Sequence, residues 1–483
     1  MTRQRILVAS NRAPVSFVEE DGQLVPRRGA GGLVAALAPA VQDTGGLWVA
    51  AAMSDGDRRM AAESPDGRVK AVVDDAAYLL RLLDFDPATY DRFYNEISNR
   101  LLWFLHHYLW DLPREPALGT DAREAWDSYR QVNRIFAEAL ADDVGTEGTE
   151  VLVQDYHLSM VPAELRRLSL GARIVHFSHV PFAAADYLRL LPHEIREGLL
   201  DGLLGADLVG FHTERWAENF LGACRLLDGA VVMYRRRAVR WRDRLVRVGV
   251  YPIAIDAASL RAAAGSPEVR RARRDLDRWR GERKLLLRVD RAELSKNILR
   301  GFLAYEDFLR RRRDWRGRVV FLALLQPSRR AVPEYRAYSE ECVREVERIN
   351  RELGSRDWTP IDVRMNDDYD EVLAAYGLYD ALMVNPVFDG MNLVAKEGPL
   401  LNRRHGALIL SRTAGAWAEL GRASVSVDPV DVAGTAEAIA EALEMPEEER
   451  AVRAATLRRA AGARTPAQWA GRQLRDLERI TGG

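Results

Sequence analysis

Two carboxylates, Asp389 and Glu397, lie eight residues apart where a strand pattern gives way to a helix pattern. Residues 381–398 read ALMVNPVFDGMNLVAKEG: an apolar run typical of a buried parallel strand, a turn, and a helix expected over 391–401. A helix that begins directly after a turn offers backbone N–H groups and the positive end of its dipole to an anion. Amides for a phosphate and carboxylates for hydroxyls suit a sugar nucleotide. An ordinary α/β turn capped by Asp389 is the alternative.

Basic residues follow the next candidate strand. The loop DRAELSKN after residues 285–289 contains Arg291 and Lys296, and a helix is expected from about residue 297. Fixed cations beside a helix start could balance the charge of a departing diphosphate. Arg329 follows a strand over 319–324 in the same way. Solvated loop residues are the alternative, which is favoured for Arg329 taken alone.

Polar residues also end several strands of the N-terminal half. Ser10-Asn11-Arg12 follows a strand at 6–9, and a glycine loop with Gly31 and Gly32 precedes a helix expected over 33–41. The GAGG sequence lacks the G-x-G-x-x-G spacing of dinucleotide-binding folds, so a dehydrogenase is disfavoured. A glycine loop that closes over a phosphate or sugar is the preferred interpretation.

Two further strands end in chemically capable residues, Asp155 after 151–153 and His179 after 173–177. The carboxyl ends of parallel strands are where open α/β sheets bind ligands. Residues 90–110 are rich in aromatic side chains, most of which fit a helical core. Tyr94 and Trp103, nine residues apart, are expected on one face of a continuous helix, where rings with polar tips could contact a sugar phosphate.

The whole chain sets limits on the class of protein. Its 483 residues are 47% hydrophobic and 29% charged, with a formal net charge of −1, which argues against nucleic-acid binding. Cys224 and Cys342 lack metal-ligand spacing, and the start of the chain shows no signal-peptide pattern. No apolar run approaches the roughly 20 residues that span a bilayer. We therefore expect a cytoplasmic protein that acts without a membrane.

Repeated β–α units on both sides of a linker near residues 250–256 predict the fold class: α/β, with two doubly wound parallel-sheet domains facing a cleft. The expected boundaries are 1–252 for the first domain, 253–455 for the second, and 456–483 for a helical end that packs back on the first. Further strands are expected at 208–211, 361–364, 381–384 and 407–410, and a long helix at 332–353.

These motifs together resemble a known family, the retaining glycosyltransferases that make trehalose 6-phosphate. The resemblance covers nearly the whole chain and rests on short segments in the order and spacing of that family. They are SNR at 10–12, GGL at 31–33, YNEISNRLLW at 94–103, QDYHL at 154–158, HVPF at 179–182, SK at 295–296, FLAYE at 302–306, PSR at 327–329 and DGMNLVAKE at 389–397. It implies the GT-B arrangement of two Rossmann-like domains.

The resemblance also implies roles for individual residues. The phosphate of glucose 6-phosphate would be held by Arg12, Tyr94, Trp103 and Arg329, with Trp48 lining the cleft and Asp155 holding acceptor hydroxyls. The donor, a nucleoside-diphosphate glucose, would contact His179, Arg291, Lys296, Asp389, Gly390, Met391, Asn392, Leu393, Val394 and Glu397, with Gly31 and Gly32 in a loop that orders on binding. The catalytic set would be Asp155, His179, Arg291, Lys296 and Asp389.

The implied reaction is front-face glucosyl transfer with retention, without a metal or other cofactor. Its partners are the two small-molecule substrates, and assembly into a homo-oligomer is compatible with the resemblance. Lys296→Ala is expected to abolish turnover and to leave the fold intact, because a loop lysine would be solvated.

Departures from the family pattern keep two points open. The family loop resembles RLDYSKG, whereas this chain has Leu294 for the tyrosine and Asn297 for the glycine. Related pseudo-glycosyltransferases, which couple cyclitols, lack the full LVAKE segment that this chain keeps, so true glucosyl transfer is preferred over cyclitol coupling or a non-catalytic sugar-phosphate sensor. Residues 364–368 are expected near the base, and GDP-glucose is hypothesised to be at least as good a donor as UDP-glucose.

Overall fold

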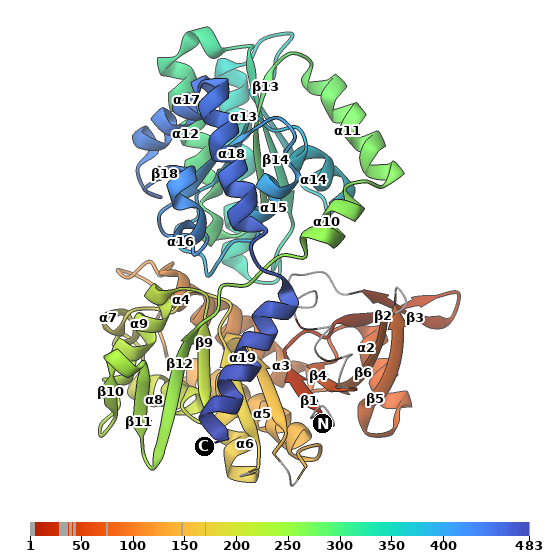
Figure 1. Cartoon of the computed structure of the whole chain (residues 1–483), viewed down its shortest axis with the longest axis vertical. Helices are drawn as coiled ribbons and strands as arrows, with labels where there is room; N and C mark the ends of the chain where they lie inside the picture. The colour runs from red at the N-terminus through yellow and green to blue at the C-terminus, as the bar shows by residue number, and fades with distance from the viewer. Residues whose placement is uncertain are drawn as a thin grey trace. The chain divides into compact units, whose positions relative to one another are not determined.

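The computed structural model describes residues 5–28, 37, 41, 45–73, 76–145, 148–169 and 171–482. The chain divides into two compact units, one formed by Met1–Ile253 with Pro466–Gly483 and the other by Ala254–Thr465. Each unit is built on its own sheet with helices beside it (Figure 1).

The first unit contains a ten-stranded sheet in the order β10-β11-β12-β9-β8-β7-β1-β4-β6-β5. The seven strands from β12 to β6 run parallel, and the antiparallel β10-β11 and β5 extend the two edges. The strand bounds are β1 Ile6–Ala9, β4 Leu47–Ala51, β5 Arg68–Val73, β6 Ala76–Leu83, β7 Glu150–Gln154, β8 Arg173–Phe177, β9 Leu208–Phe211, β10 Val231–Met233, β11 Ala238–Trp241 and β12 Arg244–Val250. A separate hairpin is formed by β2 Val15–Glu20 and β3 Gln23–Arg28.

Helices accompany these strands. They are α2 Asp55–Glu63, α3 Pro87–Asp91, η2 Arg92–Leu102, α4 Trp103–His107, α5 Thr120–Ala141, α6 Val161–Leu168, α7 Ala185–Leu188, α8 His193–Leu203, α9 Glu214–Cys224 and α19 Pro466–Thr481, with short 3₁₀ turns η1 Pro65–Gly67, η3 Tyr156–Leu158 and η4 Tyr234–Arg236. The apolar residues of β1, β7 and β8 are all buried, which is the pattern of strands covered on both faces.

The second unit has an all-parallel six-stranded sheet in the order β15-β14-β13-β16-β17-β18. Its strands are β13 Lys284–Arg291, β14 Val319–Gln326, β15 Ile361–Arg364, β16 Ala381–Val384, β17 Ala407–Ser411 and β18 Val425–Val427. Its helices are α10 Ala257–Ala263, α11 Pro267–Arg280, α12 Ile298–Arg311, α13 Pro333–Leu353, α14 Tyr369–Tyr376, α15 Val394–Leu401, α16 Trp417–Leu420, α17 Val432–Glu444 and α18 Glu447–Ala461, with 3₁₀ turns η5 Leu294–Lys296, η6 Arg313–Trp315 and η7 Gly421–Ala423.

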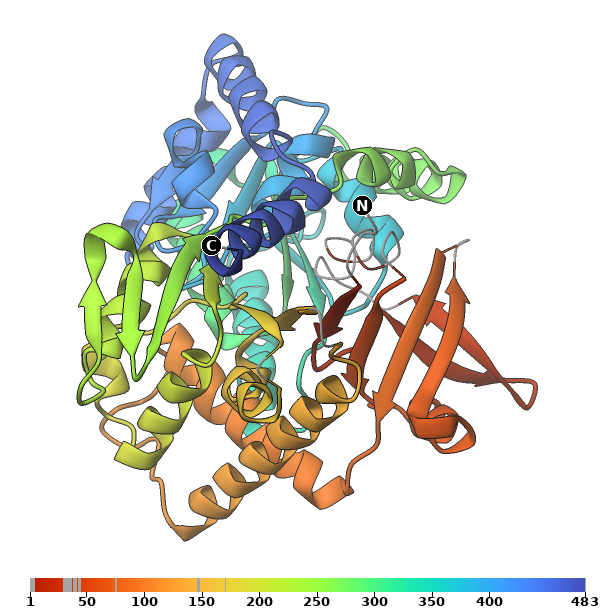
Figure 2. The ribbon, with the colours of Figure 1, turned by 60° about the horizontal axis from the view of Figure 1, so that its bottom comes forward.

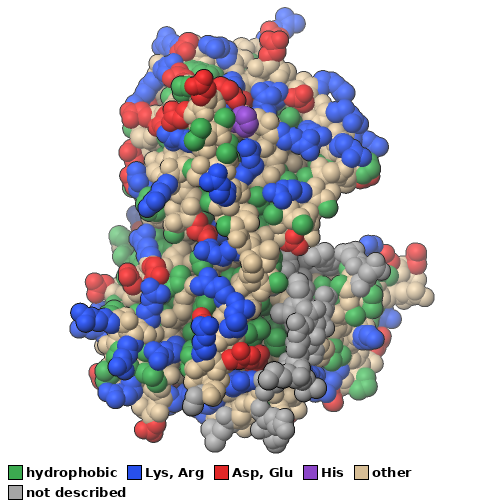
Figure 3. Space-filling view, viewed as in Figure 1, with side chains coloured by type: hydrophobic (Ala, Val, Ile, Leu, Met, Phe, Trp, Pro, Cys, Tyr) green, Lys and Arg blue, Asp and Glu red, His purple; other side chains and the backbone are tan. Residues whose placement is uncertain are grey.

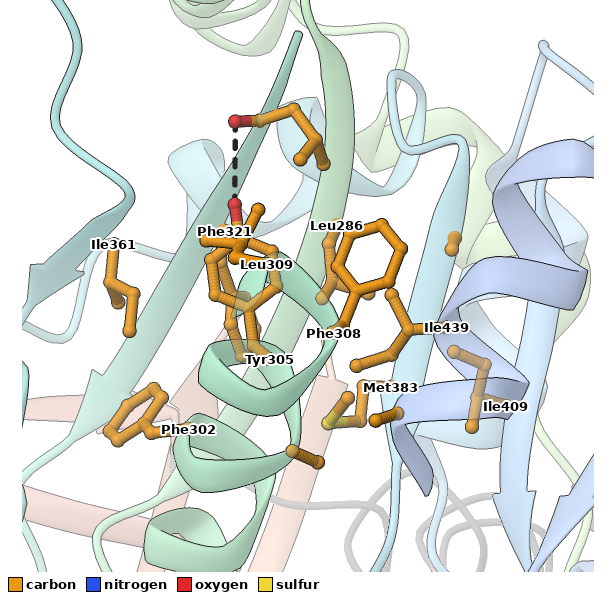
Figure 4. Close-up of a cluster of buried hydrophobic side chains, with 14 of the residues drawn as sticks. Leu286, Phe302, Tyr305, Phe308, Leu309, Phe321, Ile361, Met383, Ile409 and Ile439 are labelled. Carbon is orange, nitrogen blue, oxygen red and sulfur yellow. Dashed lines mark hydrogen bonds between the residues drawn. The ribbon is translucent and has the colours of Figure 1, made fainter. Parts of the chain in front are cut away.

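The core of the second unit lies between its sheet and helices α12, α13 and α17. Figure 4 shows Phe302, Tyr305 and Phe308 of α12 among strand residues such as Leu286 and Phe321. The Tyr305 hydroxyl, buried with its ring, donates to the Val319 carbonyl at 3.3 Å. This packing fixes β13, whose last residue is Arg291, and β14, whose carboxyl end leads into the loop that contains Arg329.

The observed division of the chain differs from the expected boundaries in its last part. The predicted boundary after residue 455 lies inside α18, a helix of the second unit, and the return to the first unit comes at Pro466. Helix α19 then packs on the first unit (Figures 1 and 2). The Trp469 ring of α19 contacts the Phe177 ring of β8, with 5.0 Å between the ring centroids. The Trp469 indole also donates to the Tyr251 carbonyl at 3.0 Å.

The visible face in Figure 3 carries basic and acidic side chains interspersed, in keeping with the near-zero net charge. Within the described ranges, no helix has both the length and the apolar composition required to span a bilayer.

Candidate active site

In the second unit, two loops meet through one ion pair. The Lys296 ammonium, at the end of the loop after β13, lies 2.7 Å from Asp389 Oδ2 in the loop after β16. The side chains are 13% and 14% exposed. Burial by itself would lower the pKa of Lys296, but the charges of Asp389 and Asp290 outweigh it and raise the pKa. Lys296 is therefore a fixed cation, and its description as a solvated loop lysine is wrong.

The turn before α15 is shaped by Asn392. Its φ of 75° lies in the left-handed region, so the helix begins at Val394 and the expected start at Met391 is wrong by about one turn. The Asn392 amide donates to Asp389 Oδ2 at 3.1 Å, and its carbonyl accepts from the Ala395 N–H at 3.2 Å. Gly390 and Leu393 belong to the same turn, which orients Asp389 toward Lys296.

Glu397 lies one helical turn farther along α15. The Tyr376 hydroxyl donates to Glu397 Oε2 at 3.2 Å. Burial raises the pKa of Glu397, and the hydrogen bond from Tyr376 acts in the opposite direction. The carboxylate is held by a neutral donor, which suits an acceptor of ribose hydroxyl hydrogen bonds.

A second cluster joins the arginines named in the sequence analysis. Arg291 Nη1 lies 3.2 Å and Arg329 Nη1 3.8 Å from the same atom, Oε1 of Glu293. Ser328 donates its hydroxyl hydrogen to that oxygen at 2.8 Å. The sequence analysis did not single out Glu293. An acidic residue between Arg291 and Lys296, two basic residues five positions apart, was a signal that could have identified it.

Two further residues support these loops: Arg288, which the sequence analysis missed, and Asn297, which it noted only as a departure from the family pattern. Arg288 is fully buried in β13, where it donates to Asp290 Oδ2 and to the Lys296 carbonyl, each at 3.0 Å. Asn297 has a φ of 58°, and its amide donates to the Asn385 carbonyl at 2.9 Å and to the Pro429 carbonyl at 2.6 Å. Asparagine tolerates the left-handed conformation that glycine adopts, which explains Asn297 as a departure from the family glycine.

In the first unit, Arg12 and Tyr94 meet at the carboxyl end of β1. Arg12 Nη2 donates to the Tyr94 hydroxyl at 3.3 Å. The Trp48 indole donates to Ser10 Oγ at 2.7 Å, and Ser10 in turn donates to the Arg12 carbonyl at 2.6 Å. Trp48 is fully buried, so the expectation that it lines a cleft is wrong. Its indole instead supports the loop that contains Arg12, through Ser10.

The aromatic segment forms a continuous helical region with an unexpected geometry. Residues Arg92–Leu102 are a π-helix, and the Trp103 N–H donates to the Ser98 carbonyl five residues earlier. In an α-helix with ~3.6 residues per turn, nine residues make about two and a half turns and lie on opposite faces. The wider π turn corrects that phase. Tyr94 and Trp103 therefore both reach η3: Tyr94 stacks on His157 and Trp103 contacts Tyr156, each at 5.9 Å between ring centroids.

Asp155 and His179 are brought together as expected. Asp155 Oδ1 accepts the His179 backbone N–H at 3.0 Å, and Asp155 has a φ of 71°. The His179 ring lies 3.0 Å from Gln154 Oε1, which accepts the ring N–H. Burial lowers the pKa of His179 well below its usual value, and His212 and His176 add to the shift. His179 is a neutral hydrogen-bonding group.

A cavity of about 310 Å³ borders this site in the first unit. Its wall includes Tyr94 and Tyr90, whose rings stack at 5.7 Å, together with Arg58 and Asn95. Gly31 and Gly32 lie outside the described residues. In the described part of the chain, no three His, Cys, Asp or Glu side chains form a group that could hold a metal ion. Whether the activity needs a metal stays a prediction.

Comparison with known proteins agrees with this arrangement. The model of glycosyltransferase family 20 matches residues 4–479. The chain belongs to glycosyltransferase family 20. The predicted family and the predicted α/β class with two Rossmann-like domains are thereby confirmed.

Three relatives illustrate the range of this family. A bifunctional trehalose-6-phosphate synthase/phosphatase from Thermoproteus tenax is 36% identical over 96% of the chain, which spans only 62% of that protein. Validamine 7-phosphate valienyltransferase from Streptomyces hygroscopicus subsp. limoneus is 34% identical over 99% of the chain and 95% of its own length. A solved α,α-trehalose-phosphate synthase (UDP-forming) from Burkholderia xenovorans, in complex with glucose 6-phosphate, has a TM-score of 0.82 at 29% identity, covering 98% of this chain and all of that one.

Proposed function

We propose that the chain transfers glucose from a nucleoside-diphosphate glucose to glucose 6-phosphate and forms α,α-trehalose 6-phosphate with retention. The observation that carries this proposal is the ion pair between Lys296, at the end of η5, and Asp389, in the loop before α15. It fixes a cation and a carboxylate where a diphosphate and a sugar hydroxyl are expected to lie. The relative in complex with glucose 6-phosphate supports the acceptor.

The proposed route is front-face substitution. The acceptor hydroxyl oxygen forms a bond to the anomeric carbon on the face from which the diphosphate leaves, and the hydroxyl proton passes to the leaving phosphate oxygen. Lys296 and Arg291 offset the charge that develops on the diphosphate. Asp389 Oδ2 is engaged by Lys296 and Asn392, which suits a hydrogen-bond acceptor for glucose better than a nucleophile.

In the first unit, a different set of groups would position the sugars. Arg12 and Tyr94 would hold the acceptor phosphate, and Asp155 would accept hydrogen bonds from acceptor hydroxyls. His179, kept neutral by burial, would contact the donor glucose without adding charge. Because the imidazole of His179 would be neutral, the charge that develops during the reaction would stay on the diphosphate.

The base of the donor is the finer question. Asp368, one of the residues expected near guanine, caps α14 by accepting the Glu371 N–H at 3.0 Å. Asn366 donates to Glu371 Oε2 at 3.3 Å. These engagements weaken the case for guanine, and a UDP-forming relative supports uracil. We therefore place UDP-glucose first and GDP-glucose second.

A product assay tests the proposal. The chain is incubated with glucose 6-phosphate and, separately, UDP-, GDP- and ADP-glucose, without added metal, and the products are identified by mass and by anomeric configuration. Formation of α,α-trehalose 6-phosphate is expected, fastest with UDP-glucose. Failure to form a disaccharide phosphate with any donor, with and without Mg²⁺, would overturn the proposal.

One observation supports a second candidate function. The valienyltransferase matches nearly full length and is as similar as the synthases are. If the chain couples cyclitols, it should turn over a nucleotide-activated cyclitol with a cyclitol phosphate and leave glucose 6-phosphate unused. Running both acceptors in the same assay separates the two activities.

A further inference from the structure

Glu293 is a wholly buried carboxylate to which the proposed reaction assigns no role. Its side chain is 0% exposed and lies in the loop that joins Arg291 to Lys296. One of its oxygens, Oε1, receives Arg291 at 3.2 Å, Ser328 at 2.8 Å and Arg329 at 3.8 Å. A single oxygen atom is thus the meeting point of two cations.

The sheet explains this meeting. Strands β13 and β14 are parallel neighbours, with Arg291 in register with Gln326. The Ala292 N–H continues the ladder by donating to the Gln326 carbonyl at 2.8 Å. The loops leaving both strands therefore start side by side, which places Glu293 against Ser328 and Arg329.

The charge of Glu293 depends on its neighbours. Burial alone would raise the pKa of this carboxyl, but Arg291, Arg329 and Lys296, with the hydrogen bond from Ser328, lower it to about 2. In the described part of the chain, Oε2 of Glu293 has no hydrogen-bond partner. The ionised form is thus stabilised mainly by cations gathered on one side.

The two arginines differ in the exposed fraction of their side chains. Arg329 is 11% exposed, donates to the Tyr335 hydroxyl at 2.6 Å and lies over the Tyr335 ring at 5.4 Å. Arg291 is 46% exposed. Arg291 is therefore the cation of this cluster that a ligand in solvent can contact most readily.

We propose that Glu293 is the resident counter-ion of Arg291 and Arg329, and that it weakens diphosphate binding so that the product nucleoside diphosphate is released. The inference rests on the proposed function, in which Arg291 binds the donor diphosphate and Arg329 the acceptor phosphate. Glu293 touches neither substrate in this account and is a positioning residue.

The sign of its effect follows from electrostatics. A carboxylate that shares a guanidinium with an incoming phosphate competes for its hydrogen bonds and repels its charge. Removing that charge should therefore tighten the binding of a diphosphate, by about tenfold for one charge-assisted contact. A purely structural role predicts the opposite, because a disturbed loop binds the ligand more weakly.

Calorimetric titration of the full chain with inorganic pyrophosphate tests this sign. Glu293→Gln keeps the shape of the side chain and removes its charge. Glu352→Gln is the matched control: it makes the same change in net charge near the far end of α13, about 26 Å along the helix from Tyr335. We expect about tenfold tighter binding for Glu293→Gln and binding within about twofold of wild type for Glu352→Gln.

Two readouts guard against a folding defect. Glu293→Gln removes an anion from beside the mostly buried Arg329, so the melting temperature of this variant should fall without pyrophosphate and rise more than that of the wild type when pyrophosphate is added. If Glu293→Gln does not fold, Glu293→Asp, which keeps the charge and withdraws the oxygen, should bind pyrophosphate about threefold more tightly.

The outcomes separate this inference from the proposed function. Equal or weaker pyrophosphate binding by the folded variants overturns the role of Glu293, even if the wild type forms the disaccharide phosphate. Tighter binding together with a wild type that forms no disaccharide phosphate supports the counter-ion and overturns the function. Slower turnover of Glu293→Gln at saturating substrates, with lower Michaelis constants, supports both.

Discussion

The candidate groups of the two units are held in place by different forces. In the first unit, Asp155, His179 and Tyr94 are fixed by backbone hydrogen bonds and ring stacking, and the imidazole is neutral. In the second unit, Lys296 and Arg291 are fixed by ion pairs with Asp389 and Glu293. The groups proposed for the acceptor are thus organised by shape, whereas those proposed for the donor are organised by charge, which suits the exchange of one anion for another.

The largest effect should come from breaking the donor side. Lys296→Ala is expected to reduce turnover by about 10³-fold, because it removes a fixed cation from the leaving diphosphate. Unlike a solvated lysine, it should also lower the free energy of unfolding by about 3 kcal/mol, because the mostly buried Asp389 carboxylate loses its neighbouring cation. Turnover and urea unfolding measure the two effects.

Lys284→Ala provides the control for that experiment. Lys284 forms an ion pair with the buried Asp380 at 3.1 Å, at the opposite end of β13. It should cost stability and leave turnover near the wild-type level. A Lys296→Ala enzyme that remains active would remove the diphosphate role from this residue.

The acceptor side should respond in binding rather than in the chemical step. Arg12→Ala is expected to raise the Michaelis constant for glucose 6-phosphate by about 30-fold with little change in kcat, because a phosphate remote from the reacting hydroxyl contributes uniform binding. Steady-state kinetics with both substrates varied checks this split.

Arg58→Ala is the matched change, since Arg58 lines the neighbouring 310 Å³ cavity and lies outside the proposed phosphate set. It should leave the Michaelis constant for glucose 6-phosphate within about twofold. An unchanged value in Arg12→Ala would place the acceptor phosphate elsewhere.

The strands were the part of the fold that sequence could predict best. The bounds expected for β1, β8, β9, β15 and β16 agree with those observed, because short apolar runs bounded by polar residues have few other uses in a parallel sheet. The ends of these strands in turn predicted which candidate residues lie at the carboxyl edge of each parallel sheet.

Contacts between loops could not be predicted in the same way. Glu293 meets Ser328 from 35 positions away, and Lys296 meets Asp389 from 93. Such pairs depend on strand order, which no local pattern encodes. The π-helix was missed for a related reason: periodicity assumes the α turn, and the extra width is stabilised by packing of Tyr94 and Trp103 on η3.

The neutral His179 of the first unit should make the stability of the fold depend on pH. The folded pKa of His179 is depressed by burial, so this residue stabilises the fold fully above pH ~6.5 and progressively less as the pH falls and the unfolded chain takes up the proton. At pH 5.5 the loss from one such histidine is about 1.4 kcal/mol.

Urea unfolding at pH 7.5 and 5.5 checks this sign. When the pH is lowered from 7.5 to 5.5, the unfolding free energy of His179→Gln should fall by about 1.4 kcal/mol less than that of the wild type. The exposed His193 on α8 provides the control, His193→Gln, which should change the decrease little. A decrease as large in His179→Gln as in the wild type would show that the folded state protonates this imidazole.

The smallest effect should come from Trp48, which supports the acceptor loop without bordering it. Trp48→Phe keeps a buried ring and removes the indole N–H that donates to Ser10 Oγ. Ser10 then loses one of the contacts that orient the Arg12 carbonyl, so the loop should loosen. We expect a loss of about 1 kcal/mol in unfolding free energy and a roughly threefold higher Michaelis constant for glucose 6-phosphate, with kcat unchanged. Ser10→Ala leaves the ring unchanged and removes both this hydrogen bond and the one that Ser10 donates to the Arg12 carbonyl, so its kinetic effect should be at least as large. If Trp48→Phe raises the constant as much as Arg12→Ala does, the indole contacts the acceptor directly, and Trp48 is a binding residue rather than a support for the loop that contains Arg12.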